Sequence, residues 1–457
     1  MREFPLGICQ TDGMTTASTP TPPCASAVRL LADWRRLCRK IGERRAGGAG
    51  ERAAAGFLAE RFAGMGLSVD CEPFPCRSLV ESRSSAAVRS GGRWQGAEAL
   101  SYVNSASTPG GGGLVEGDLA WIESPESMHR LRDGSLRGKV LVLFGQLPDS
   151  TRAYRRLIAA RPAGILQVDD REPFSWPIQN ALLPEWVRRF GSLPVAGIAY
   201  RTAWKWRRQN VTRARVAILA RHRQALSANV VATLAGTSPS EPAILFGAHH
   251  DTPPGLAGAD DNASGVVSLL ELARILAAVP NRRRTLVFAS FGTEEQLSVG
   301  SAQYVRRHRR DLDRIGLVVN FDSIASLLGH NRLSHSGQPG LGEFFQSHLR
   351  RRGYDLELID TVTPFADHFP FTAFGIPAVW FYRSNVAGGG RWQHHSGHNQ
   401  DSLANVSVGE LCRLLDALAP PLLRLAGART WPFTGKMPPA LAVQTAQYAR
   451  KWFGLRV

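Results

Sequence analysis

The apolar positions along the chain change their period twice, and each region predicts a different kind of structure. From residue 28 to about residue 66 they recur at helical spacing, which predicts two helices packed as a hairpin. Residues 80–222 hold short β-type runs between Gly- and Pro-rich turns, which indicates a separate mixed domain. From residue 229 buried-type strands alternate with helical segments. This alternation predicts a largely parallel sheet covered by helices on both faces.

Three apolar runs of the last region are typical of buried parallel strands, and polar residues end each of them. "AILFGAHH" leads to His249 and Asp251, "TLVFASFG" leads to Glu294 and Glu295, and "IGLVVNFDS" contains Asp322. In sheets of this kind ligands bind outside the carboxyl ends of the strands. We therefore expect these side chains to share one edge of one sheet.

Two further segments add polar residues to this set. They are the loop "GLAGADDNASG" and the segment "RWQHHSGHNQDS", which contribute Asp260, Asp261, His394, His395, His398 and Asp401. Taken singly, each cluster is explained by helix capping, turn chemistry or solvated charge. Their joint occurrence in order at strand ends predicts a metal site instead. Zinc accepts histidine nitrogen and carboxylate oxygen, and a pair of ions needs a carboxylate that can bridge them.

Six motifs in order resemble the zinc metallopeptidases of family M28, which include secreted bacterial aminopeptidases, glutamate carboxypeptidases and glutaminyl cyclases. The motifs are "FGAHHDT", "GADDNASGVVSLLELAR", "FGTEEQLSVGS", "VVNFDS", "FADHFPFTAFGIPAV" and "HHSGHNQDSLANVS". The likeness covers Asn229 to about Leu423, and "AGGAGERAAAGFLAERFAGMGLSV" fits the usual start of that fold. It implies an α/β fold with a mostly parallel central sheet flanked by helices.

The resemblance also implies a role for each residue of the site. His249 and Asp322 would hold one zinc ion, Glu295 and a late histidine would hold the other, and Asp261 would bridge the two. Glu294 would be the general base, because a carboxylate committed to a metal, such as Glu295, is a poor base.

Other residues of the motifs would support the site. Asp251 is suited to fix the orientation of the His249 imidazole. Asp367 and His368, in "ADHFPF", would lie near the substrate.

The late histidine departs from the family pattern, which places it four residues before an aspartate. Four residues before Asp401 the chain has a glycine, Gly397. His395 is favoured as the ligand because its "HS" resembles the family's "H-[ST]", and His398 is the alternative.

The middle region resembles a protease-associated domain inserted near the start of the peptidase fold. "GDLAWIESP", "LRGKVLVLFG", "AARPAGILQVDD" and "LPVAGIAY" carry this likeness. The expected organisation is a flexible leader (1–27), a discontinuous zinc peptidase domain (28–79 and 223–457) and the inserted mixed β/α domain (80–222).

The charge and composition of the chain limit the binding partners and the cellular location that we expect for it. The chain has 55 Lys+Arg against 38 Asp+Glu, but the basic clusters are scattered and no nucleic-acid module surrounds them, so a solvated surface is expected. No run approaches the roughly 18 apolar residues of a membrane span, and the leader lacks the apolar core of a signal peptide. A cytoplasmic location is therefore expected, with export as the alternative. The six cysteines are expected to be free thiols, with a Cys71–Cys76 pair as the alternative in an exported chain.

These observations predict an exopeptidase with two zinc ions, in the first place an aminopeptidase that releases N-terminal residues from a peptide. One alternative is a carboxypeptidase or amidase of the same fold, in which arginines bind a substrate carboxylate. The other is a non-catalytic binding protein with a decayed site. The sequence leaves the oligomeric state and the preferred side chain open.

Overall fold

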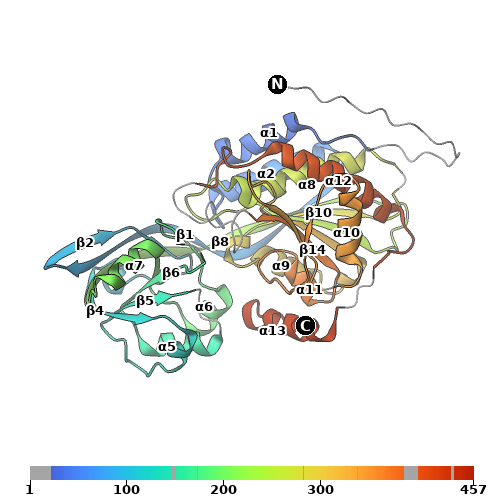
Figure 1. Ribbon diagram of the computed structural model, residues 1–457. Helices are drawn as coiled ribbons and strands as arrows, with labels where there is room; N and C mark the ends of the chain where they lie inside the picture. Colours follow the sequence, from blue (N-terminus) through green and yellow to red (C-terminus); the bar gives the residue numbers. More distant parts are fainter. Residues whose placement is uncertain are drawn as a thin grey trace.

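The computed structural model describes residues 22–145, 150–171, 173–280, 282–336, 338–384, 400–433 and 437–457. Figure 1 shows two lobes joined by a pair of long strands, with the middle of the sequence forming the smaller lobe. Both the N-terminal helices and about the second half of the chain contribute to the larger lobe. The predicted metal site falls in this larger lobe.

A mixed sheet forms the centre of the larger lobe, in the order β13-β12-β14-β11-β9-β10-β8. Strands β10, β9, β11 and β14 run parallel to one another, whereas β8 is antiparallel to β10, and β12, which is parallel to β13, is antiparallel to β14. The strands are β8 (Arg213–Leu234), β9 (Ala243–His249), β10 (Leu286–Phe291), β11 (Ile315–Phe321), β12 (His330–Ser334), β13 (Glu357–Ile359) and β14 (Ala378–Ser384). The predicted α/β class is confirmed, with a sheet that is parallel at its centre and mixed overall.

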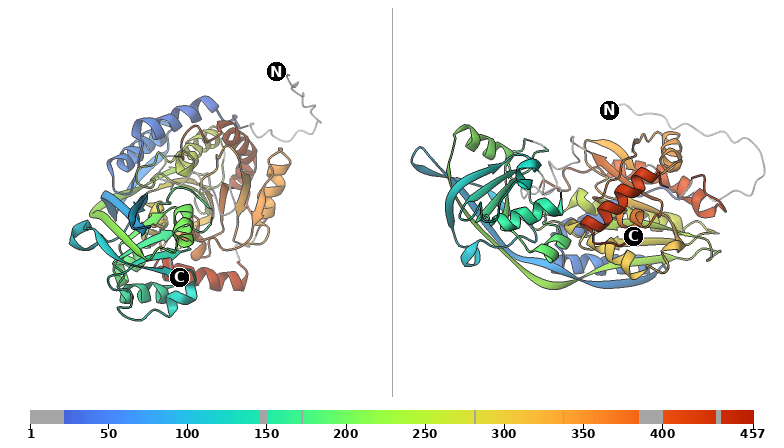
Figure 2. Two further views of the ribbon diagram at one scale, coloured as in Figure 1. Left: turned by 60° about the vertical axis from the view of Figure 1, so that its left-hand side comes forward. Right: turned by 90° about the horizontal axis from the view of Figure 1, so that it is seen from below.

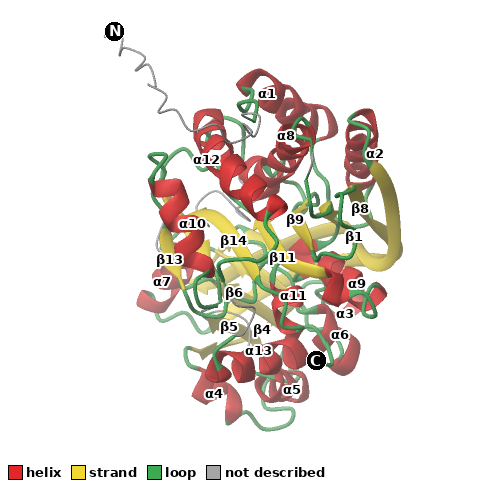
Figure 3. Ribbon diagram, turned by 90° about the vertical axis from the view of Figure 1, so that its right-hand side faces the viewer, coloured by secondary structure: helices red, strands yellow, loops and turns green. Residues whose placement is uncertain are grey.

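Helices cover both faces of this sheet, as Figure 3 shows. Phe246 of β9 points to the face covered by α1, α2, α8, α10 and α12, and its neighbour Leu245 points to the face covered by α9 and α11. The helical segments are α1 (Ala27–Arg35), η1 (Arg36–Ile41), α2 (Ala49–Gly64), η2 (Ala259–Ser264), α8 (Gly265–Ala277), η3 (Glu294–Gln296), α9 (Val299–Arg307), η4 (Leu312–Arg314), α10 (Leu341–Arg350), α11 (Phe369–Ala373), α12 (Val408–Gly427) and α13 (Pro439–Trp452). Burial on both faces explains the nearly continuous apolar strands.

Helix α8 is the central helix of the larger lobe, and the predicted helical face is buried. All its residues are buried except Arg274 and Ala277, because α8 packs on the sheet and is covered in turn by α1, α2 and α12. The predicted N-terminal helices are present, but both pack on α8, and α2 also lies against β1 (Ser68–Ser90) and β8. The start of α8 is therefore held rigidly beside the strand ends.

The smaller lobe has its own sheet, in the order β4-β5-β6-β7-β3, which joins the larger sheet where β4 pairs with β8. Its strands are β2 (Arg93–Ala97), β3 (Ala99–Ser101), β4 (Val115–Ile122), β5 (Val140–Phe144), β6 (Gly164–Val168) and β7 (Val195–Ile198). Its helices are α3 (Pro109–Gly112), α4 (Pro125–His129), α5 (Thr151–Ala160), α6 (Pro184–Phe190) and α7 (Tyr200–Arg208). Two apolar clusters of its own, on opposite sides of this sheet, make it a separately packed unit.

Two long antiparallel strands, β1 (Ser68–Ser90) and β8, run from one lobe into the other (Figure 2). Their pairing extends from Ser68 opposite Thr233 to Val88 opposite Ala214, with a register shift between Leu79 and Glu81. The expected domain boundaries, 79/80 and 222/223, lie inside these two strands. The lobes are thus joined by a continuous β-ribbon rather than by flexible linkers.

The last helix, α13, links the lobes a second time. Trp186 of α6 donates its indole hydrogen to the carbonyl of Lys451 over 2.7 Å. Arg306 of α9 donates to the carbonyl of Phe453 over 2.6 Å. The end of the chain is therefore anchored to the smaller lobe on one side and to the larger lobe on the other.

The cysteines of the described residues are free, as predicted for the whole set. Cys71 and Cys76 both lie on β1, five positions apart in an extended strand, which separates them by about 16 Å at 3.3 Å per residue. A disulfide needs Cα atoms within about 7 Å, so the alternative Cys71–Cys76 pair is wrong.

Within the described residues, no helix combines the length and the apolar character that crossing a bilayer requires.

Acidification is expected to destabilise the junction of the lobes through His222 of β8. Its Nε2 accepts the backbone hydrogen of Asn104 over 3.0 Å, and burial, helped by the charge of Arg77, lowers the pKa of His222 to about 4. The unfolded chain, with an ordinary histidine pKa of about 6.5, binds the proton more readily, so stability is lost as the pH falls from about 6.5 to 4. Urea unfolding of the chelator-treated protein at pH 7 and pH 4.5 measures this loss. The His222→Gln variant should lose less stability than the wild type over the same interval, and equal losses would contradict the assignment.

Candidate metal centre

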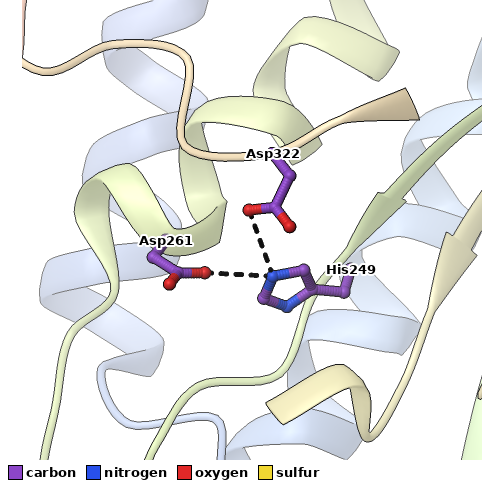
Figure 4. A group of neighbouring side chains, drawn as sticks. All are labelled: His249, Asp261 and Asp322. Atoms are coloured by element: carbon purple, nitrogen blue, oxygen red, sulfur yellow. Dashed lines mark ion pairs between the residues drawn. The ribbon is translucent and has the colours of Figure 1, made fainter. Parts of the chain in front are cut away.

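His249 is the last residue of β9, and its ring faces carboxylates that come from other segments. Its Nε2 lies 3.0 Å from Oδ1 of Asp261 and 3.5 Å from Oδ1 of Asp322, as Figure 4 shows for these three side chains. The same nitrogen lies 3.8 Å from Oε2 of Glu294. The histidine is almost fully buried, and its Nε2 makes no hydrogen bond within the described residues. Donor atoms of His249, Asp261 and Asp322 all lie within 4.8 Å of one another. The structure thus brings together three of the predicted ligands.

Asn262 connects the two segments that carry the aspartates. Its side-chain amide donates to the carbonyl of Phe321 over 2.8 Å, and its Oδ1 accepts the backbone hydrogen of Gly265 over 2.9 Å. The preceding peptide bond, between Asp261 and Asn262, is cis. The start of α8 is thereby fixed to the end of β11, which places Asp261 beside Asp322.

Two aspartates that the sequence counted among possible ligands hold the backbone instead. Asp401 accepts the backbone hydrogens of Asp260 and Asp261 over 2.6 and 2.9 Å. Asp260 accepts from the backbone of Ala325 over 2.8 Å and from the hydroxyl of Ser326 over 2.6 Å. Both carboxylates therefore fix the loop that presents Asp261.

Asp251 connects His249 to the turn that carries the two glutamates. Its carboxylate accepts the backbone hydrogens of Glu294 and Glu295 over 2.8 and 3.2 Å. The same carboxylate lies 3.4 Å from Nδ1 of His249. Asp251 thus contacts both the imidazole and the turn, and its role in orienting the imidazole stays a prediction from the sequence.

The Glu294 carboxylate has one anchored oxygen and one that faces the cluster. Oε1 accepts the hydroxyl hydrogen of Ser298 over 2.9 Å, and Oε2 points towards His249. Burial raises the pKa of Glu294 well above its usual range. His249 opposes this shift and Asp367 adds to it. A carboxylate in this environment can hold a proton, as a general base must during the reaction.

Nearby carboxylates raise the pKa values of both His249 and Glu295. Burial alone would lower the pKa of His249, but the carboxylates of Asp322, Asp251 and Asp261 outweigh burial and raise the pKa well above the usual value. Burial also raises the pKa of Glu295, and the nearby Asp261 carboxylate raises it further. The charge of Asp261 therefore contributes to the pKa shifts of both His249 and Glu295. Excess negative charge around one imidazole fits a site that receives cations.

The remaining predicted residues have different positions. Asp367 is fully buried and accepts the Ser301 hydroxyl hydrogen over 2.5 Å, and burial raises its pKa to about 7. His368 is also buried and stacks on Trp380, with a pKa lowered to about 3 by burial. Asp367 is close enough to influence the pKa of Glu294, whereas the Nε2 of His368 shares a hydrogen bond of 3.5 Å with the hydroxyl of Thr363. His395 and His398, the predicted ligands of the second ion, lie outside the described residues.

The adjacent histidines His249 and His250 have different roles. The strand alternates its side chains, so His250 points away from the cluster and shares a hydrogen bond of 3.0 Å with the hydroxyl of Ser290. Burial lowers the pKa of His250 to about 4, which keeps it neutral. This residue is part of the core.

Sequence reasoning missed Arg44, which supports the site from behind. It is completely buried and donates to the carbonyls of Gly42, His250, Ala257 and Gly258 over 2.6–3.1 Å. Gly258 has a φ of 56°, and a Cβ there would lie 2.4 Å from the Asp261 carbonyl, so glycine is required for this close approach. A charged residue within the Gly- and Ala-rich segment was the only available signal.

Glu51 of α2 was missed in the same way. It is buried and accepts the backbone hydrogens of Gly47 and Thr293 over 2.6 and 3.1 Å and the hydroxyl hydrogen of Ser227 over 2.7 Å. Burial, together with the charge of Asp251, raises the pKa of Glu51 to about 8. Because Thr293 directly precedes Glu294, Glu51 helps to hold the glutamate turn.

The fold and the cluster define the chain as an α/β protein with a candidate metal site at the carboxyl ends of its central strands. Residues 229–420 match the family model described as Peptidase family M28, so the predicted resemblance to this family is confirmed over these residues. Aminopeptidase YwaD of Bacillus subtilis is 32% identical over 34% of this chain and 35% of that protein. Leupeptin-inactivating enzyme 1 of Streptomyces exfoliatus is 28% identical over 42% of this chain and 47% of that protein. The alignments span less than half of these curated relatives.

Solved structures resemble the chain over most of its length. An M28 peptidase precursor from Shewanella amazonensis superposes with a TM-score of 0.73 at 16% identity, covering 91% of this chain and 96% of that one. A zinc aminopeptidase from Bacillus subtilis gives a TM-score of 0.68 at 21% identity, covering 90% and 97%. At these identities the likeness establishes the fold alone.

Proposed function

We propose that the chain is a zinc-dependent exopeptidase that removes N-terminal residues from peptides. The observation that carries this proposal is the convergence of His249, Asp261 and Asp322 beside Glu294 at the carboxyl ends of three strands. One imidazole nitrogen and two carboxylate oxygens are donors that zinc accepts, and a buried nitrogen without a hydrogen bond suits a metal ligand. The similarity to Aminopeptidase YwaD of Bacillus subtilis supports the same class.

A second ion is part of the proposal. Asp261 would bridge the ions, His249 and Asp322 would complete one site, and Glu295 with His395 or His398 would complete the other. The contacts of Asp251 support this arrangement, because its carboxylate accepts the backbone hydrogen of Glu295 and lies 3.4 Å from Nδ1 of His249. Zinc bound here would polarise the substrate carbonyl and make a water molecule more acidic.

Glu294 would act as the general base at its Oε2. It accepts a proton from the attacking water and passes this proton to the nitrogen of the leaving amine, which closes the proton balance of hydrolysis. The Ser298 hydrogen bond to Oε1 leaves Oε2 turned to the reacting groups. Asp251 maintains the distance between Glu294 and His249, because it contacts both of their segments.

The charge of the site favours a substrate with a free amino group. The surrounding carboxylates are those of Asp251, Asp261, Asp322, Glu294, Glu295 and Asp367. The buried cation behind them, Arg44, already donates to four backbone carbonyls. Two zinc ions would balance the charge of their own ligands, but Asp251 and Asp367 are not proposed ligands, and Arg44 is already engaged by backbone carbonyls. The remaining charge favours a substrate ammonium over a substrate carboxylate, and thus an aminopeptidase over a carboxypeptidase.

The proposal is tested by comparing free and blocked substrates on zinc-loaded protein. Release of a coloured amine from amino-acid anilides, with no cleavage of N-acetylated dipeptides, is the expected result. Cleavage of the blocked dipeptides alone would favour the carboxypeptidase or amidase alternative. A protein that binds no zinc and cleaves neither class would be a binding protein. Peptide is the proposed partner, and the cytoplasmic location stays a prediction that cell fractionation tests.

A further inference from the structure

The turn that carries Glu294 and Glu295 adopts a strained backbone. Thr293, Leu297 and Ser298 have φ values of 58°, 71° and 46°, in the left-handed region that non-glycine residues rarely adopt. Each such residue costs on the order of 1 kcal/mol, so three of them around one short turn require support from neighbouring segments. The contacts of this turn therefore decide where the two glutamates lie.

The larger lobe supports the first half of the turn. Glu51 accepts the backbone hydrogen of Thr293, and Asp251 accepts those of Glu294 and Glu295. These contacts leave the second half, which begins at Gln296, to other partners.

The smaller lobe supports the second half through the side chain of Gln296. This side chain is buried, its Nε2 donates to the carbonyl of Arg77 on β1 over 2.8 Å, and its Oε1 accepts from Nδ2 of Asn104 over 3.2 Å. Asn104 follows β3 and belongs to the smaller lobe. The residue directly after the glutamate pair is therefore held between the connecting ribbon and the smaller lobe.

Asn104 is itself fixed by the smaller lobe and the connecting ribbon. It is completely buried with a φ of 63°, its carbonyl accepts the Ser192 hydroxyl hydrogen over 2.5 Å, and its backbone hydrogen goes to His222. Its amide donates one hydrogen to the carbonyl of Leu182 over 3.1 Å and directs the other to Gln296. Asparagine suits this position because it tolerates the left-handed conformation and carries two donors.

We propose that Asn104 is a positioning residue, through which the smaller lobe sets the Glu294–Glu295 turn by the hydrogen bond to Gln296. This inference rests on the proposed function, in which Glu294 is the base and Glu295 a zinc ligand. It gives the inserted lobe a defined part in the reaction, since a displacement of its Asn104 shifts the turn that holds both glutamates.

The test uses Asn104→Gly, Gln296→Met and the double variant of the full chain. Glycine adopts a φ of 63° without strain, and methionine keeps the length of glutamine, so each change removes the hydrogen bond with little disturbance of the backbone. Residues that orient metal ligands typically alter zinc affinity by about 10–100-fold when they are replaced. We expect a loss of this size in the affinity for the weaker zinc ion by calorimetric titration, a similar fall in kcat, and an unchanged KM. The loss in the double variant should be smaller than the sum of the two single losses, because the Asn104–Gln296 hydrogen bond is absent in all three variants, while Asn104→Gly also removes the contact with Leu182 and Gln296→Met the contact with Arg77.

The matched control is Gln179→Met. Gln179 is also a buried amide of the smaller lobe, but its Nε2 donates to the carbonyl of Ser101 over 3.0 Å. This variant should lower the melting temperature while zinc affinity and kcat stay at wild-type values. Equal losses in the control would show a general effect of loosening the lobe and would overturn the inference.

The outcomes separate this inference from the proposed function. Wild-type protein that binds zinc and cleaves anilides, beside an Asn104→Gly variant with unchanged kcat and zinc affinity, refutes the positioning role alone. Additive losses in the double variant refute it as well. Wild-type protein without zinc binding and without hydrolysis refutes the proposed function, and the positioning role with it.

Discussion

Replacing Glu294 with glutamine is expected to reduce kcat by about 10²–10⁴-fold, the usual contribution of a general base. Glutamine preserves the size of the side chain and can still accept the hydrogen bond of Ser298 at its carbonyl oxygen. It cannot accept a proton from water at pH 7. The loss should therefore appear in kcat, with KM and zinc content close to wild type, when anilide hydrolysis and metal content are measured together.

Glu271→Gln provides a matched control for this variant. Glu271 is another buried carboxylate of the larger lobe, but it is paired with Arg29 and Arg274 on α1 and α8. Its replacement should lower stability without a comparable change in kcat. If Glu294→Gln kept more than a tenth of the wild-type kcat, or if its zinc content fell to zero, Glu294 would not be the base.

The elements that carry the site were predictable because they are apolar and periodic. Strands ending at His249 and Phe291 are buried on both faces, so their sequences are nearly continuous apolar runs. The buried face of α8 follows from its 3.6-residue period. Burial imposes these patterns on the sequence directly, whereas β1 and the first part of β8 lack such runs because their buried residues alternate with half-buried or exposed ones.

The support of the site was not predictable, because it consists of hydrogen bonds between residues far apart in the chain. Arg44 and Glu51 lie about 200 residues before the segments that they hold, and Asn104 is equally distant from Gln296. An asparagine that follows a short strand carries no local signal of such a contact. The sequence identified Asp401 as a candidate ligand, but it does not reveal that the Asp401 carboxylate accepts hydrogen bonds from the backbone of Asp260 and Asp261. Sequence patterns therefore identify candidate metal ligands, whereas the tertiary structure shows which carboxylates face the metal site and which hold the backbone.

Chelation is expected to abolish hydrolysis and to lower the melting temperature by several degrees, with both restored by added zinc. The metal-free site holds many carboxylates around one imidazole, and their mutual repulsion is relieved when cations bind. A ligand that binds only the folded state contributes about 4 kcal/mol when its free concentration is 1,000 times its Kd. Thermal unfolding in excess chelator and in buffered zinc measures this contribution, and unchanged melting temperatures would contradict a structural role for the metal.

Asp261→Ala should remove the zinc-dependent part of stability together with the activity, because Asp261 is the proposed ligand of both ions. Its Oδ1 lies 3.0 Å from His249, and its charge raises the pKa of Glu295, so its loss affects the two sites at once. Asp70→Ala, which removes an exposed carboxylate from β1, is the control and should respond to zinc as the wild type does. A variant that lacks Asp261 and yet gains as much stability from zinc as the wild type would exclude the bridging role. One that keeps a single tightly bound ion would place Asp261 in only one of the two sites.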